Sequence, residues 1–418
     1  MQASIGSRVM ALARRCFVAY LLLSTVPFPL HLIPVVDGWM IEARRPWLVV
    51  VEWVGREVLG ASAVPRNSGS GDAMYYYVSA LCIAVVAVVV ALVWPRLAGT
   101  RALSSRVLDR SRAYMCLYLG SYLLVYGWNK LIPTQMPIPG PDRVIVPYGD
   151  SSPMGLLWTF MGASAGYQML TGLVEVVSGS LLFWRRTWLL GGLLSLLAMS
   201  NVVALNFCYG VPVKLFSAHL LVIALFIVAP DLGRLVDLLW HNRPVVPRAI
   251  DPHPIARRGW WWAARLSKIG LYLIVSISGI VVGGRYLMSK GRLAQPGPLH
   301  GVFRVVSFSR DGVTELPDAV RWVRVGINEI GIGAIQRADG SSERFKLKIQ
   351  EDGRRMVWQR IGEDTSFSMF YPLLDSGEFR LAGSFEAGWT VAILERQDEP
   401  PLLTSREFRW IQERPFNR

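Results

Sequence analysis

Seven long apolar stretches constrain the fold of this chain more than any other feature. A transmembrane helix needs about 20 predominantly apolar residues, and each stretch approaches or exceeds that length. The seven expected spans lie near residues 16–36, 75–94, 114–132, 156–183, 188–208, 214–229 and 269–288. Only 18% of the 418 residues are charged, whereas 52% are hydrophobic. The sequence therefore predicts an α-helical membrane bundle over residues 1–295, and it excludes a disordered chain, a coiled coil and a purely cytosolic enzyme.

The net charge of +14 belongs to the apolar part of the chain. Residues 300–418 hold 17 Lys and Arg against 18 Asp and Glu, whereas residues 1–299 hold 27 against 12. A nucleic-acid-binding domain would carry its basic residues on one soluble face, so we expect the lipid bilayer as a partner and no nucleic acid. Of the basic residues near the spans, 17 lie in one set of alternate connections and 10 in the other. The positive-inside rule then predicts a multi-pass inner-membrane protein with a cytoplasmic N-terminus and, after seven spans, an extracytoplasmic C-terminus.

Two of the expected outer loops have distinct patterns. In residues 37–73, apolar side chains between Pro46 and Val54 are flanked by charged ones, which predicts a helix lying in the membrane interface. Residues 133–153 contain six prolines. Proline removes a backbone donor and fixes φ, so this segment is expected to be an extended, rigid loop and not a helix.

The hydrophobic pattern changes to a period of two after Pro296-Gly297-Pro298. Eight or more short alternating segments follow, the last at residues 407–411, and turns such as Asp311-Gly312 and Asp339-Gly340 separate them. This pattern predicts one antiparallel β-barrel or sandwich over residues 300–418, outside the cytoplasm. A closed barrel of this size can hold one small apolar ligand. A filled core with a docking role is the alternative that the pattern leaves open.

The chain carries no common catalytic motif. Its four cysteines all lie in expected spans and form no C-x-x-C pair, which disfavours a dithiol redox centre. It has no phosphate loop, no H-E-x-x-H and no G-x-S-x-G, and its five histidines show no metal-ligand spacing. Catalytic residues therefore cannot be assigned, no metal is expected, and whether the protein is an enzyme stays open.

Polar residues inside the expected spans are the remaining candidates. Glu175 lies ten residues before Arg185, which is about 15 Å along a helix and close to mid-membrane. A carboxyl at that depth is costly unless it faces the bundle interior and is paired. The candidates for a polar cavity or ligand site are Glu175, Lys130, Asn201, Asn206, Lys214 and His219. They serve either to fix helix packing by hydrogen bonds or to line a pocket for a lipid, a quinone or a proton path.

Residues 120–230 resemble the DoxX-like family of integral membrane proteins. The stretches that carry the resemblance are Tyr126-Gly127-Trp128-Asn129-Lys130, Phe160-Met161-Gly162, Gly172-Leu173-Val174-Glu175, Arg185-Arg186-Thr187 and Asn206 to Lys214. The resemblance implies a four-helix core within residues 114–230. The family takes its name from a subunit of a thiosulfate:quinone oxidoreductase, so the resemblance also implies a link to redox processes. The added spans and the β domain depart from the family pattern, and Gly301-Val302-Phe303 resembles the Gly-x-Trp start of lipocalins.

Two functions from different classes follow as expectations. The first is a redox-associated membrane protein that holds a quinone or a similar apolar ligand in its helix bundle. Such a site needs only a few hydrogen-bonding side chains in an apolar pocket. The alternative is a non-enzymatic protein that binds or transfers lipids or other hydrophobic ligands, with the β domain as a periplasmic receiver.

Overall fold

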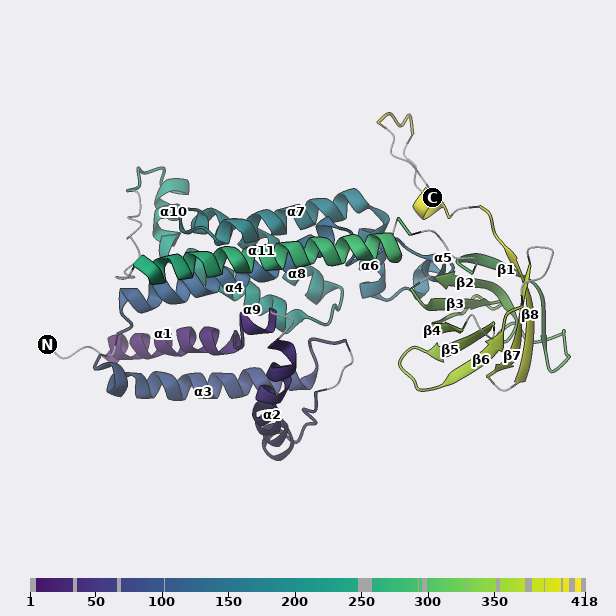
Figure 1. Cartoon of the computed structure of the whole chain (residues 1–418), viewed down its shortest axis with the longest axis horizontal. Coiled ribbons are helices and arrows are strands. Elements are labelled where there is room, and N and C mark those ends of the chain that lie inside the picture. Colours follow the sequence, from purple (N-terminus) through teal and green to yellow (C-terminus); the bar gives the residue numbers. More distant parts are fainter. Residues whose placement is uncertain are drawn as a thin grey trace. The chain divides into compact units, whose positions relative to one another are not determined.

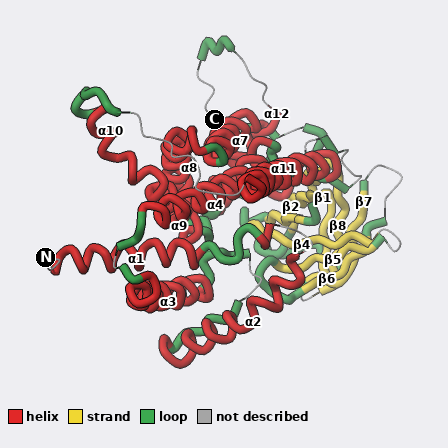
Figure 2. Tube along the Cα trace, turned by 60° about the vertical axis from the view of Figure 1, so that its left-hand side comes forward, coloured by secondary structure: helices red, strands yellow, loops and turns green. Residues whose placement is uncertain are grey.

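The computed structural model divides the chain into two compact units, each made of two stretches of sequence. The first unit holds residues 1–131 and 170–282, and the second holds residues 132–169 and 283–418. Among the described residues, every strand belongs to the second unit (Figures 1 and 2). The structure describes residues 5–32, 36–65, 69–100, 102–246, 258–291, 293–294, 299–328, 330–350, 354–372, 378–386, 388–399, 401–405 and 410–414.

The first unit is built from helices. They are α1 (Ile5–Ser24), α2 (Asp37–Trp53), α3 (Met74–Ala98), α4 (Ser105–Leu131), most of α7 (Ala165–Leu182), α8 (Trp188–Cys208), α9 (Lys214–Val228), α10 (Leu232–Leu239) and most of α11 (Arg258–Ser289). α1 packs beside α3, and α9 packs against both α8 and α4 (Figure 1). Buried apolar side chains, among them Leu119, Leu123 and Ile227, form the core between these helices.

Four helical segments of the described chain are long and apolar enough to cross a membrane. They are Met74–Ala98, Arg185–Cys208, Lys214–Leu239 and Gly259–Ser289. These correspond to the expected spans at 75–94, 188–208, 214–229 and 269–288. Seven spans are not confirmed. α4 covers the expected span at 114–132 and is long, but its tyrosine, arginine and lysine side chains keep its mean hydropathy low.

Two expected spans are not continuous helices. The segment 16–36 is interrupted because α1 ends at Ser24, ahead of Pro27 and Pro29, and residues 33–35 lie outside the described chain. The segment 156–183 is split into α6 (Pro153–Ala163) and α7. Ser164 lies between them with extended dihedral angles, and its Oγ accepts a hydrogen bond from the Tyr167 N–H at 3.3 Å. A serine in this role caps a new helix, so the apolar run is not one continuous helix, and a single span over 156–183 is not confirmed.

The two outer-loop predictions have different outcomes. α2 matches the helix expected in residues 37–73, and its Trp47 Nε1 donates to Ser79 Oγ of α3 at 2.9 Å while Val49 stays exposed. The proline-rich segment 133–153 is mostly non-helical, but it contains the short helix α5 (Pro141–Val144). Proline is well tolerated at a helix start, and Pro141 occupies that position, so the expectation of a fully extended loop is wrong here.

The second unit contains a closed antiparallel barrel in which each strand pairs with the next and β8 pairs with β1 (Figure 1). Its strands are β1 (Gly301–Arg310), β2 (Trp322–Asn328), β3 (Ile332–Arg337), β4 (Ser342–Gln350), β5 (Arg355–Arg360), β6 (Ser366–Phe370), β7 (Phe379–Phe385) and β8 (Gly388–Arg396). The barrel form of the prediction is confirmed. The ninth expected strand, at 407–411, and the Pro296-Gly297-Pro298 hinge lie largely outside the described residues.

Alternation along the strands explains the barrel. In β7, Phe379, Leu381 and Phe385 point inward and are buried, whereas Arg380 and Ser384 between them are exposed. This period of two places one apolar face inside the barrel. The interior is filled by large buried side chains, including Trp322, Phe345, Trp358 and Phe385. Of the two alternatives that the sequence left open for the barrel, the structure therefore has the filled core.

Candidate functional site

A buried ion pair joins α4 to α7 in the helical unit. Lys130 Nζ donates a hydrogen bond to Glu175 Oε1, and less than a tenth of either side chain is exposed. The second carboxylate oxygen, Glu175 Oε2, is buried and has no hydrogen-bond partner among the described residues. A buried carboxylate with one unsatisfied oxygen is costly, so this pair is an incompletely satisfied polar point inside the described part of the bundle.

Glycine packing brings α4 and α7 close enough to form this pair. A Cβ added at Gly172 would lie 2.4 Å from the Leu131 nitrogen, and one added at Gly127 would lie 2.8 Å from the Val176 nitrogen. Farther along, Gly120 and Gly179 approach each other's backbones in the same way. Small residues let two membrane helices pack backbone to backbone. Lys130 and Glu175 are therefore held on facing helices at very short range.

The structure places the other candidates from the sequence at separate points. Asn206 Nδ2 donates to Ser217 Oγ at 3.0 Å, and His219 Nε2 lies 2.5 Å from the Tyr20 hydroxyl. Lys214 pairs with Asp72 at 3.3 Å. Asn201 is exposed. Of the six candidates, only Lys130 and Glu175 contact each other through their side chains in the described contacts, so the six do not form one cavity.

A row of tyrosines on α4 leads to the ion pair and was missed in the sequence interpretation. Tyr114, Tyr118, Tyr122 and Tyr126 recur every four residues, and Lys130 continues the spacing. Residues four apart lie on one face of a helix. The rings of Tyr118 and Tyr122 are 4.9 Å apart, and those of Tyr122 and Tyr126 are 6.5 Å apart. The fourfold spacing in an otherwise apolar segment is the signal that could have revealed this row.

Two features connect the tyrosine row to its surroundings. The Tyr122 hydroxyl lies 2.9 Å from His31 Nε2. Tyr126, one turn before Lys130, lies within electrostatic range of Glu175 and is 36% exposed. The row therefore extends from the interior of the bundle to the surface of the helical unit beside the ion pair.

Ion pairs also mark the other end of α4. Arg112 Nη2 donates to Asp231 Oδ2 at 2.7 Å, and both side chains are buried. Asp231 Oδ1 in turn accepts from Arg234 at 2.9 Å. Asp109 pairs with Arg185. Because the carboxylates of these clusters are matched by guanidinium groups, we interpret this end as a structural anchor.

The second unit contains a cavity of about 440 Å³ beside the barrel. Its walls come from the proline-rich segment 133–144, the end of α11, the start of β1, the turn after β2, and the chain after β8. Lys290 and Glu399 are the charged side chains of opposite sign among its lining residues, and both are exposed. The cavity lies outside the filled barrel interior, and sequence patterns alone gave no sign of it.

Asp142 fixes one wall of this cavity to the barrel. It is buried, and its carboxylate accepts hydrogen bonds from Asn328 Nδ2 at 3.0 Å and from Arg344 Nη2 at 2.5 Å. The neighbouring Arg143 is half-buried, and this burial lowers the pKa of the Arg143 guanidinium. The positive charge of Arg344 lowers the same pKa further, whereas the negative charge of Asp142 raises it. α5 is therefore held against the strands by charge-assisted hydrogen bonds.

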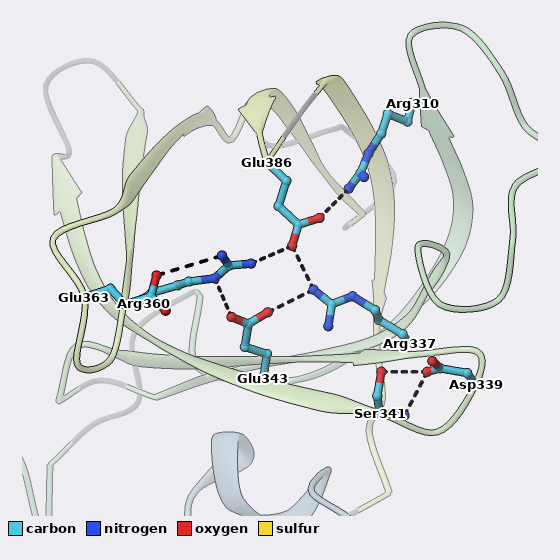
Figure 3. Close-up of polar contacts among 8 residues, drawn as sticks. All are labelled: Arg310, Arg337, Asp339, Ser341, Glu343, Arg360, Glu363 and Glu386. Atoms are coloured by element: carbon cyan, nitrogen blue, oxygen red, sulfur yellow. Dashed lines mark hydrogen bonds and ion pairs between the residues drawn. The ribbon is translucent and has the colours of Figure 1, made fainter.

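A second polar network covers the hairpin end of the barrel (Figure 3). Glu386 lies between Arg310, Arg337 and Arg360, with oxygen-to-nitrogen distances of 3.1, 3.0 and 2.9 Å. Glu343 completes the network by accepting from Arg337 at 2.9 Å and Arg360 at 2.6 Å. The bond to Glu343 is the main reason that the pKa of Arg360 is raised. Each of these guanidinium groups already binds a carboxylate, so the network closes the barrel end and offers no anion site.

Comparison with known proteins does not establish a family. No family model matches the chain, and no solved structure matches it. The chain is similar to the uncharacterized protein YwoB of Bacillus subtilis (strain 168), with 25% identity over 134 residues. The matched region is 32% of this chain and 84% of that protein. The name of this relative assigns no activity, so function has to be argued from the geometry.

Proposed function

We propose that this chain is an inner-membrane protein of the DoxX-like type that binds a quinone or a similar apolar ligand in its helical unit. The observation that carries the proposal is the buried Lys130–Glu175 pair with its unpartnered carboxylate oxygen. A buried polar atom without a partner is unfavourable unless a ligand, an ion or water supplies one. Tyr126 beside the pair provides an exposed aromatic face through which an apolar ring reaches it from the bilayer.

The chemistry of these residues fits a quinone in both of its redox forms. Lys130 has three N–H donors, of which one bonds to Glu175 Oε1, and a quinone carbonyl accepts from another. Glu175 Oε2 accepts from the hydroxyl of the reduced form. A bound quinone would supply electron-carrying chemistry. The residues of this chain orient the ring, exclude water and hold a proton at the Lys130 ammonium or the Glu175 carboxyl.

A binding experiment on the full-length protein tests this proposal. The purified protein in detergent is titrated with decylubiquinone, and quenching of tryptophan fluorescence is followed. Saturable binding should weaken at least tenfold in Glu175→Gln and in Lys130→Met, because each change alters one of the two side chains that are proposed to hydrogen-bond the quinone. Glu57→Gln, at an exposed glutamate of the same unit, is the matched control. Equal affinity in the wild type and both site variants would contradict the proposal, provided that their melting temperatures show that they are folded.

The proposal includes an orientation, with the N-terminus in the cytoplasm and the barrel outside. It is supported by the 17 basic residues in one set of connections against 10 in the other. Fusions of alkaline phosphatase and of a green fluorescent protein to Arg418 test it. Phosphatase activity without fluorescence is expected. Fluorescence without phosphatase activity would place the barrel in the cytoplasm and overturn the orientation.

A non-enzymatic role in lipid handling is the second candidate, and the cavity beside the barrel favours it. Because the barrel interior is filled, a hydrophobic ligand of the second unit has to bind elsewhere, and this cavity of about 440 Å³ has the size of a small-molecule site. Organic extraction of the purified protein separates the two functions. A quinone at a fixed ratio to protein favours the first, and a phospholipid alone at a fixed ratio favours the second.

A further inference from the structure

The cavity of the second unit adjoins the end of the last candidate span. Tyr286 lies in the final turn of the segment Gly259–Ser289, and Lys290 follows that segment directly. Both residues line the cavity. Tyrosine is enriched at membrane–water interfaces, and lysine near a helix end extends its ammonium group toward the interface. If this helix crosses the bilayer, as the proposed function holds, the cavity opens at the level of the lipid headgroups.

The lining of the cavity combines apolar side chains with two opposite charges. Pro133, Pro137 and Ile330 are among its apolar lining residues, whereas Lys290 and Glu399 supply an ammonium and a carboxylate. Neither charge forms an ion pair within the part of the chain that the structure describes. Both charges are exposed and available to an occupant. A molecule that pairs with both carries an anionic and a cationic group, and the apolar lining residues suit an apolar part.

We infer that this cavity binds the headgroup of a zwitterionic phospholipid with a primary ammonium, such as phosphatidylethanolamine. Its phosphate pairs with Lys290, its ammonium donates to Glu399 and to the side-chain oxygen of Gln397, and its acyl chains follow the apolar lining residues. A quaternary ammonium such as choline is recognised by several aromatic faces. Tyr286 is the one tyrosine, tryptophan or phenylalanine among the described lining residues, so the cavity lacks an aromatic cage and discriminates against phosphatidylcholine.

Native mass spectrometry of the full-length protein tests this inference. The protein is released from detergent in the presence of equal amounts of palmitoyl-oleoyl phosphatidylethanolamine, phosphatidylglycerol and phosphatidylcholine, and lipid adducts are counted. The ethanolamine lipid should be enriched at least threefold over both others. Lys290→Ala and Glu399→Gln should each reduce its binding about fivefold, which corresponds to the loss of one solvent-accessible ion pair. Lys290→Arg should retain it.

Matched controls and further outcomes separate this inference from its alternatives. Lys348→Ala, on β4 and outside the lining of this cavity, and Asp398→Asn, next to Glu399, should leave the adducts unchanged. Equal retention of the three lipids, or enrichment of phosphatidylglycerol that depends on Lys290 alone, would overturn the zwitterionic assignment. Binding of soluble glycerophosphoethanolamine without the intact lipid would assign the site to a free metabolite and overturn a lipid ligand. Glu175→Gln should not change the adducts, so a failed quinone proposal leaves this test intact.

Discussion

Lys130 on α4 and Glu175 on α7 form an ion pair across 45 residues of sequence, with less than a tenth of each side chain exposed. Two charges removed from water cost several kcal/mol each, and their attraction offsets that cost only while both are present. Removing one partner of the pair should therefore cost much more stability than removing both.

Single and double substitutions at this pair should differ sharply in thermal stability. Lys130→Met or Glu175→Leu alone should lower the unfolding free energy by about 3–5 kcal/mol, because each leaves an uncompensated buried charge. The double variant should recover most of that loss. Thermal unfolding in detergent, followed by tryptophan fluorescence, measures all four proteins. Additive losses in the double variant would show that the two side chains do not interact.

Glycine substitutions on α7 should separate close packing from helix propensity. A Cβ at Gly172 would meet backbone atoms of α4 at 2.4 Å and 2.7 Å, whereas nothing lies within 4 Å of a Cβ at Gly166. Gly172→Ala should therefore destabilise the protein by about 1–3 kcal/mol through overpacking. Gly166→Ala should be neutral or slightly stabilising. Thermal melting of both variants decides the matter, and equal melting temperatures would contradict the close approach of α4 and α7.

The barrel was predictable because its signal is local. Strands such as β7 alternate buried and exposed side chains along the chain itself, and Asp311-Gly312 has the positive φ angles that its turn chemistry predicts. The break at Ser164 escaped prediction because an apolar run of the right length hides a single capping serine. The sequence also indicated Glu175 as a buried carboxyl. That Glu175 pairs with Lys130, and not with Lys214 or His219, depends on glycine contacts between α4 and α7. No pattern along a single helix reveals such contacts.

The cavity beside the barrel was not predictable for a related reason. Its walls come from lining residues between 133 and 144, from 286, 290, 291, 294 and 300–302, from 328 and 330, and from 397, 399, 401 and 404, which are far apart in the sequence. Asp142 draws the first of these to the barrel through Asn328 and Arg344. Such contacts depend on tertiary structure, whereas the proline content that the sequence shows explains only why the segment is mostly not helical.

Removal of the Asp142 carboxylate should release α5 from the barrel. Asp142→Ala leaves the Arg344 guanidinium without its buried partner, which should cost about 2–4 kcal/mol of local stability. Hydrogen exchange of the amides of residues 141–146 should accelerate accordingly in the full-length protein. Asp150→Ala, at an exposed aspartate of the same loop, is the control. Unchanged exchange in Asp142→Ala would show that the loop is held by other contacts.

Acid should weaken the turn between β3 and β4 through Asp339. The Asp339 carboxylate accepts hydrogen bonds from Ser341 Oγ at 2.6 Å and Ser341 N at 2.9 Å, and these bonds lower its pKa below the ordinary 3.8 (Figure 3). A lowered pKa in the folded state contributes stability at neutral pH that is lost as the pH falls below 3.8 through the folded-state pKa.

Ser341→Ala tests that pH dependence. The variant should melt at a slightly lower temperature than the wild type at pH 7, because it lacks the hydrogen bond from Ser341 Oγ to the Asp339 carboxylate. The difference should shrink as the pH falls below 3.8, because the protonated Asp339 carboxyl is a weaker acceptor for the Ser341 hydroxyl than the carboxylate is. Ser342→Ala is the control. A difference that stays constant with pH would mean that Ser341 acts without the charge of Asp339.

The filled interior of the barrel predicts a specific response to core substitutions. Trp358 is fully buried, and its ring packs edge-on against Phe345 at 5.6 Å. Trp358→Ala should lower stability by about 3–5 kcal/mol and leave a cavity lined by apolar side chains. Such a cavity binds small apolar molecules, so the variant should gain saturable binding of a benzene-sized probe and be restabilised by it. Trp358→Phe, which keeps most of the ring and removes a buried N–H without a partner, should lose much less stability and bind no probe. If the wild-type barrel binds the probe with the same affinity as Trp358→Ala, its interior is open, and the second unit receives its ligand there rather than beside Lys290 and Glu399.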